Sequence, residues 1–355
     1  MAQFTIPNIE IKGISACVPP TIERTDEIPF YTPEEAQSVI EATGVKQKHI
    51  ATEGITASDL CVEAARQLLE VLDWSPESID FLCFVTQTPD FQNHPNAFVA
   101  HEKLGLSENC IVLDLYHGCP GWVMGLSSSV SMMSLGSFKR GLLLAGDVIT
   151  RTQYKLGKED RPLFGDAGTA TALAFSENAT PIFFDMGTDS RNGEALIRKK
   201  GRLRDPFTPE SFQLEYEMLN GSKSTDGVDD LMDGMSVFAF GISKPPKSIK
   251  KLLEATGNSI DTIDKVILHQ ANKMMVDRIL KKLKVPSEKA PLGMINYGNT
   301  TSASIPLAIV TECRDEYSSK DLTTVCCGFG TGLSWASALF KTNKIACPQL
   351  TIYNS

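Results

Sequence analysis

Cys119 stands in the segment DLYHGCPGW, where a nucleophilic thiolate could form. The apolar run before it predicts a strand that ends near Tyr116, Gly118 permits a tight turn, and Pro120 suits the start of a helix. A sulfur at a helix N-terminus lies close to unpaired N–H groups and to the positive end of the helix dipole, which both favour the thiolate. Apolar burial would act in the opposite direction. The alternative to a nucleophile is a small buried thiol, the common state of a free cysteine.

His269 is the best placed of the five histidines to assist such a nucleophile. It ends the predicted strand VILH, and open α/β sheets keep their active sites at the carboxyl ends of strands. His117, two residues before Cys119, is a rival base whose direction the sequence leaves open. A buried structural histidine remains the alternative for His269.

Two further segments carry groups that could stabilise a developing oxyanion. Asn299 in NYGNTTSAS lies in a turn before a helix, where it could cap that helix or donate to an oxyanion. The segment GFGTGLSWAS has three spaced glycines after a buried strand, which favours a cluster of backbone N–H groups for an oxyanion or a phosphate. The sequence contains no Walker A motif, no G-x-S-x-G and no HExxH, and none of its cysteines forms a C-x-x-C pair, so we expect no metal site.

An internal duplication would supply the elements that position these residues. Residues 58–73 predict an amphipathic helix, and a buried strand follows over 80–85. The stretch 246–271 repeats this order of helix, turn and strand, and it aligns with the first without a gap. We therefore expect an α/β fold with two similar halves. Their predicted extents are 1–178 with Cys119 and 231–355 with His269 and Asn299, joined by a connecting excursion over 179–230.

Composition excludes several classes of protein. Of 355 residues, 42% are hydrophobic and 22% charged, as in globular proteins. The net charge of −9 argues against a nucleic-acid-binding protein. No stretch approaches the ~18 apolar residues of a membrane span, and the first residues lack the pattern of a signal peptide. Nine scattered cysteines indicate reduced thiols, so we expect a cytoplasmic protein.

Taken together, these segments resemble the 3-oxoacyl-[acyl-carrier-protein] synthase III (beta-ketoacyl-ACP synthase III) family of the thiolase superfamily. The resemblance covers nearly the whole chain. It rests on ATGVKQKHI (42–50), TPDF (88–91), HGCPGW (117–122), GDVITRT (146–152), LFGDAGTATAL (163–173), MDGMSVF (232–238), HQAN (269–272), YGNTTSASIP (297–306) and GFGTGLSW (328–335). It implies a thiolase-like five-layer αβαβα sandwich, a homodimer with its active sites near the interface, and Cys119, His269 and Asn299 as the catalytic triad.

The resemblance also implies a chemistry, an acyltransferase reaction of fatty acid biosynthesis without a cofactor. Cys119 would accept an acyl group from acyl-CoA or an acyl carrier protein, with the backbone N–H groups of Cys119 and Thr331 as the oxyanion hole. Malonyl carrier protein would then lose carbon dioxide, and His269 and Asn299 would stabilise the enolate that attacks the acyl-cysteine.

Other positions follow from the same resemblance. Three residues are expected to bind substrate and three lysines to dock the acidic carrier protein: Phe238, Arg151 and Gly234, and Lys273, Lys281 and Lys282. The basic run Arg198–Arg204 is an alternative docking surface.

Departures from the family pattern keep other functions open. Ser38 and Ala42 stand where members that take short acyl-CoA have a tryptophan and an arginine. The alternative function is a divergent type III enzyme of a specialised pathway, which moves the acyl group to a nucleophile other than malonyl carrier protein. The intact triad disfavours a third reading, a non-catalytic partner subunit.

Overall fold

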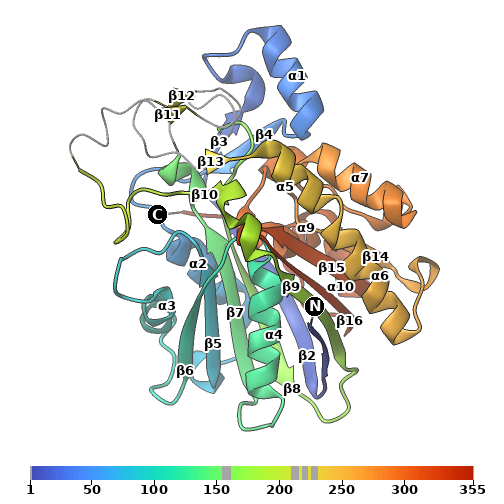
Figure 1. Ribbon diagram of the computed structural model, residues 1–355. Coiled ribbons are helices and arrows are strands. Elements are labelled where there is room, and N and C mark those ends of the chain that lie inside the picture. Colours follow the sequence, from blue (N-terminus) through green and yellow to red (C-terminus); the bar gives the residue numbers. More distant parts are fainter. Residues whose placement is uncertain (1, 154–160, 209–215, 218–222, 225–230, 355) are drawn as a thin grey trace.

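Two β-sheets form the frame of the protein in a computed structural model, which describes residues 2–153, 161–208, 216–217, 223–224 and 231–354 (Figure 1). The first sheet has the order β17 (Thr351–Ile352), β2 (Ile9–Val18), β8 (Ala167–Phe175), β7 (Arg140–Asp147), β5 (Phe81–Thr86) and β6 (Ile111–Tyr116). The second has the order β1 (Ala2–Ile6), β9 (Ile182–Thr188), β16 (Ser334–Asn343), β15 (Asp321–Gly330) and β14 (Lys265–Leu268).

Helices fill three layers around these sheets. Two lie between the sheets, α4 (Gly121–Met133) and α9 (Ser304–Glu312). The outer face of the first sheet is covered by α2 (Ala57–Val71) and α3 (Asn96–Leu104), and that of the second by α6 (Lys244–Thr256) and α7 (Lys273–Leu283). The predicted five-layer αβαβα sandwich is confirmed.

Smaller elements complete the described chain. The short helices are α1 (Pro33–Thr43), α5 (Gly234–Gly241), α8 (Met294–Tyr297) and α10 (Arg314–Ser319). Three two-stranded ribbons pair β3 (Thr21–Arg24) with β4 (Gln47–Ile50), β10 (Leu196–Ile197) with β13 (Leu231–Met232), and β11 (Tyr216–Glu217) with β12 (Lys223–Ser224). Among the helices described, none is long and apolar enough to cross a membrane.

The core sits in three clusters, one between the sheets and one under each outer helical layer. Trp122 of α4 and Ile309 of α9 are fully buried in the central cluster. Because α4 and α9 have a sheet on either side, they are apolar almost all round, as a buried helix must be. α2 instead buries one face, and a capping box between Thr56 and Asp59 fixes its start.

The predicted duplication is confirmed by the strand order. β2-β8-β7-β5 repeats as β9-β16-β15-β14, and both sets pair antiparallel, antiparallel and then parallel. β6 has no counterpart strand within the described part of the second sheet. The residues before Asn299 form the short helix α8 instead.

Strand pairing adds two details to the domain boundaries, which remain a proposal at 1–178, 179–230 and 231–355. β9 falls in the predicted connecting stretch, yet it is an inner strand of the second sheet. The chain ends are also exchanged, since β1 joins the second sheet and β17 the first.

Candidate active site

Cys119 lies at the N-terminus of the buried helix α4, three residues after the end of β6. Pro120 is the N-cap, so the helix begins one residue later than predicted. The turn is in close contact with the end of β15. A Cβ on Gly330 would lie 2.7 Å from the Cβ and 2.8 Å from the Sγ of Cys119, and a Cβ on Gly328 would lie 2.5 Å from the Cα of Pro120. The spaced glycines of GFGTG therefore let this strand end reach the nucleophile.

Burial opposes the charged form of Cys119. The side chain is almost inaccessible, and this raises the pKa of the thiol to about 12. Hydrogen bonds from the backbone N–H and the hydroxyl of Thr331 lower that pKa, while the nearby charge of Asp147 raises it. In the free protein at neutral pH, Cys119 is therefore a thiol whose deprotonation Thr331 assists.

His269 follows β14 and is 1% exposed. Its backbone N–H donates to the Cys327 carbonyl at 2.9 Å, and its Nδ1 lies 2.7 Å from the hydroxyl oxygen of Ser304, the first residue of α9. The ring stands edge-on to Phe329. Burial lowers the pKa of His269 to about 3, so the imidazole is neutral at pH 7.

Hydrogen bonds of the backbone hold Asn299 in place, and hydrogen bonds of its side chain orient its amide. Its N–H donates to the Leu163 carbonyl at 2.8 Å, and its carbonyl accepts from the Gly165 N–H at 3.1 Å. The side-chain Oδ1 accepts the Thr301 N–H at 3.0 Å, and Nδ2 lies 3.5 Å from the Ala271 carbonyl. With Oδ1 occupied, the amide N–H group is the part of the side chain left for a ligand.

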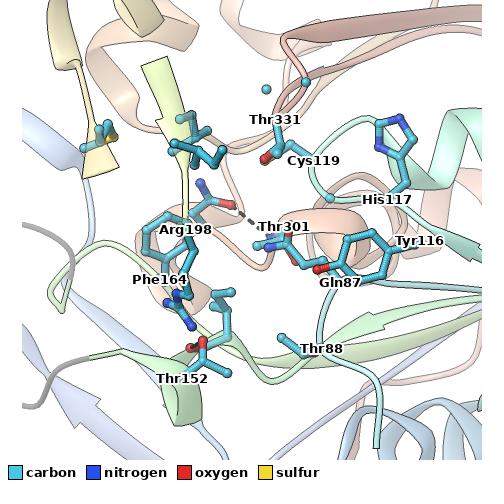
Figure 2. Close-up of a pocket in the computed structure, with 18 of the residues that line it drawn as sticks. Gln87, Thr88, Tyr116, His117, Cys119, Thr152, Phe164, Arg198, Thr301 and Thr331 are labelled. Atoms are coloured by element: carbon cyan, nitrogen blue, oxygen red, sulfur yellow. Dashed lines mark hydrogen bonds between the residues drawn. The ribbon is translucent and has the colours of Figure 1, made fainter. Parts of the chain in front are cut away.

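One cavity of about 900 Å³ brings these groups together. Its wall contains Cys119, His269, Asn299 and Thr331, which come from four separate segments of the chain. Figure 2 shows Cys119 beside Thr331 in this cavity, with Phe164 and Arg198 drawn among the other lining residues. The volume can hold an acyl chain or the arm of a thioester donor.

The α5 residues on the cavity wall are neighbours of the two that the resemblance implies. Phe238 and Gly234 are absent from the cavity wall, and Val237 and Phe240 line it instead. Residues three apart share a helix face, so Val237 and Phe240 reach the cavity together, while all three side chains also contact the outer cluster of the second half. Gly234 lies at the first, exposed turn. Arg151 does line the cavity, and it donates to the Ile55 carbonyl at 2.9 Å.

The predicted docking lysines lie outside the cavity wall. Lys273 pairs with Asp277 at 2.5 Å, and Lys281 and Lys282 are exposed on α7. The basic run of the excursion is closer to the site, since Arg198, Lys200 and Arg202 all line the cavity.

His117 also lines the cavity, and burial lowers its pKa.

Phe164 lines the cavity and forms a backbone bridge with Asn299. The sequence motifs assigned it no role, although it lies in the matched segment LFGDAG. No group of three His, Cys, Asp or Glu side chains able to hold a metal occurs in the part of the chain that the structure describes.

Comparisons with known proteins agree with this geometry. The family model described as 3-oxoacyl-[acyl-carrier-protein (ACP)] synthase III matches residues 113–190, and the model of its C-terminal part matches 253–342. A beta-ketoacyl-[acyl-carrier-protein] synthase III of Lactococcus lactis is 31% identical, over 94% of this chain and 98% of its own length.

Solved structures give the same result. A 3-oxoacyl-(acyl-carrier protein) synthase from Burkholderia xenovorans LB400 superposes with a TM-score of 0.92 at 32% identity, over 99% of both chains. The priming beta-ketosynthase of the R1128 polyketide pathway shares the fold, with a TM-score of 0.80 at 23% identity. This chain therefore belongs to the 3-oxoacyl-[acyl-carrier-protein] synthase III family and is a thiolase-like condensing acyltransferase.

Proposed function

We propose that this chain joins an acyl group to the two-carbon unit of malonyl carrier protein, with Cys119, His269 and Asn299 as its catalytic residues. The supporting observation is that these three side chains and Thr331 line one cavity, in which hydrogen bonds of the backbone and side chain hold His269 and Asn299. The reaction divides into two half-reactions that use different groups.

Acyl transfer comes first. The Cys119 sulfur attacks the carbonyl carbon of an acyl thioester, and the N–H groups of Cys119 and Thr331 donate to the resulting oxyanion. The carbon–sulfur bond to the donor breaks. The departing thiolate takes up the proton that Cys119 lost, which leaves an acyl-cysteine and a free thiol.

Condensation follows. The bond between the malonyl carbon and its carboxylate breaks, carbon dioxide leaves, and the electron pair forms an enolate. Asn299 Nδ2–H and His269 Nε2–H donate to the enolate oxygen. The enolate carbon then attacks the acyl-cysteine, and collapse of the adduct returns the Cys119 thiolate and releases the 3-oxoacyl carrier protein.

In the proposed reaction the Ser304 hydroxyl donates to His269 Nδ1. This leaves the ring proton on Nε2, where the condensation step requires it. Because the pKa of His269 is lowered to about 3, the ring acts as a neutral donor. A charged imidazole would be costly in this buried position.

The donor and partners belong to the same proposal. We propose that Arg151, Arg198 and Arg202 on the cavity wall attract the phosphate-bearing arm of acyl-CoA or acyl carrier protein, since α1 carries the small residues Ser38 and Ala42 where family members have a tryptophan and an arginine. The exposed lysines of α7 are a second candidate surface for an acidic carrier protein.

A homodimer would form through the free edge of the first sheet. β6 is the last strand of that sheet, and Ile111 and Tyr116 on it are 48% and 69% exposed. Phe91 and Phe98 nearby are also more than half exposed. An unpaired strand with an apolar surface is suited to pairing with a second copy.

A cytoplasmic location is proposed on the nine cysteines, all of which are unpaired and buried.

Intact-protein mass spectrometry tests the function. The protein is incubated with matched panels of acyl-CoA and acyl carrier proteins, with Cys119→Ala as control, and then with malonyl carrier protein while carbon dioxide is measured. A Cys119-dependent acyl adduct that is consumed with release of carbon dioxide is expected. An acylated enzyme that ignores malonyl thioesters and reacts with an amine or alcohol would instead support the specialised acyltransferase.

A further inference from the structure

Asp147 ends β7, is fully buried and takes part in neither half-reaction described above. Its carboxylate accepts hydrogen bonds from both halves of the molecule. On Oδ1 the donors are Thr86 Oγ1 (3.0 Å), Gln87 N (2.8 Å), Thr88 N (3.2 Å) and Thr88 Oγ1 (3.1 Å). On Oδ2 they are Thr301 Oγ1, Ser302 N (3.3 Å) and Ser302 Oγ (2.6 Å).

The donors on Oδ2 lie directly after Asn299 in the chain. Thr301 has a φ of 48°, a left-handed backbone that is rare for a β-branched residue. Its hydroxyl is bonded to Asp147, and its N–H donates to the Oδ1 of Asn299. Asp147 therefore holds Thr301 in the conformation that orients the Asn299 amide.

The donors on Oδ1 lie on the opposite side, at the end of β5. The Gln87 N–H is held there by its hydrogen bond to Asp147, and the Gln87 side chain lies against Gly118 in the turn before Cys119. A Cβ on Gly118 would come within 2.4 Å of the Gln87 Oε1. One carboxylate thus fixes the distance between the turn that carries Asn299 and the segment beside Cys119.

We propose that Asp147 is a positioning residue that orients Asn299 for the condensation half-reaction, acting through Thr301 and Ser302. This inference rests on the proposed function. Acyl transfer depends on the N–H groups of Cys119 and Thr331, to which Asp147 makes no hydrogen bond, and the charge of Asp147 raises the pKa of Cys119. Loss of that carboxylate should therefore slow condensation without slowing acyl transfer.

Asp147→Asn is the informative change because it keeps the shape and removes one acceptor. Backbone N–H groups cannot turn away from the carboxylate. Oδ1 accepts from two of them, and Oδ2 accepts from only one. The amide oxygen will therefore face Gln87 and Thr88, and the NH₂ group will face Thr301 and Ser302. The hydroxyls there can reverse, but the Ser302 N–H then meets another donor. The turn that aims Asn299 is the part that loosens.

The test compares the two half-reactions in single-turnover experiments on the full-length protein. In Asp147→Asn we expect acylation of Cys119 at least as fast as in wild type, and decarboxylation of malonyl carrier protein on the preacylated enzyme lower by ~10- to 100-fold. Thr301→Val removes the hydroxyl and should give the same split, while Thr301→Ser keeps it and should restore condensation. Asp185→Asn removes a buried carboxylate from β9 and should leave the ratio of the two rates unchanged.

A double mutant tests the route of the effect. In an Asn299→Ala background, Asp147→Asn should cause no further loss of condensation. Equal losses in both half-reactions, a wild-type ratio in folded Asp147→Asn or Thr301→Val, or an additive loss in the double mutant would overturn the inference. A wild-type protein that never forms the acyl-cysteine would overturn the proposed function itself.

Discussion

Two opposing effects act on the pKa of Cys119, the proposed nucleophile. Burial raises the pKa of Cys119, and the helix N-terminus and Thr331 favour the thiolate. The sequence predicted these effects separately, from HGCPGW and from the apolar runs around it. Their balance depends on how closely β15 covers the sulfur, which only the folded chain determines.

The pH dependence of acyl transfer follows from this balance. Because the pKa of Cys119 is raised to about 12, the thiolate fraction grows about tenfold per pH unit below that value. His269 has a pKa of about 3 and adds no inflection above pH 4. We expect the single-turnover acylation rate to rise continuously from pH 6 to pH 9, as measured by intact mass. A plateau that begins near pH 7 would contradict this expectation.

Gly330 has no room for a side chain. A Cβ there would contact Cys119, and its φ of 155° lies where L residues are strained. We expect Gly330→Ala to lower the free energy of unfolding by about 1–3 kcal/mol and to abolish most acylation of Cys119. Urea unfolding and adduct formation measure the two effects. Gly293→Ala is the matched control, since its Cβ meets only ordinary contacts; a similar loss of acylation there would refute the specific role.

At the scale of elements, the residues of the proposed chemistry lie at the ends of strands and the starts of helices. That Cys119, His269 and Asn299 line one cavity could be predicted, because each follows a strand or precedes a helix in a short motif. The cavity wall was less predictable, since the rotation of α5 decides whether 238 or its neighbours face inward, and eight helical residues of high apolarity give no direction. The role of Asp147 was also hidden, because its partner Thr301 is 154 positions away.

The residues of α5 that line the cavity should influence which acyl-chain lengths the enzyme accepts. Val237 lines the cavity, so Val237→Phe should shorten the space for the acyl chain and shift acylation toward shorter donors. Phe238 packs outside the wall, and Phe238→Leu should leave the preference unchanged. Acylation rates over a panel of chain lengths measure both. A shift in Phe238→Leu of the same size as in Val237→Phe would show that the helix face is assigned incorrectly.

At the scale of the whole molecule, the open edge at β6 is the feature that a second copy would cover. Ile111→Lys places a charge on that edge, and we expect it to convert a dimer into a monomer in light scattering coupled to gel filtration. Ile22→Lys is the control, because Ile22 is similarly exposed but lies on β3. A wild-type monomer, or an Ile111→Lys variant that stays dimeric, would exclude this interface.

The exchanged chain ends have a consequence for the order in which the protein is made. β1 is made before the other strands described, yet its pairing partner β9 is far along the chain, with Phe4 opposite Phe184. β17, at the other end, completes the first sheet by pairing Thr351 with Cys17. β1 must therefore stay unpaired until β9 has been made, and the first sheet lacks its β17 strand until the strands of the second sheet have been made.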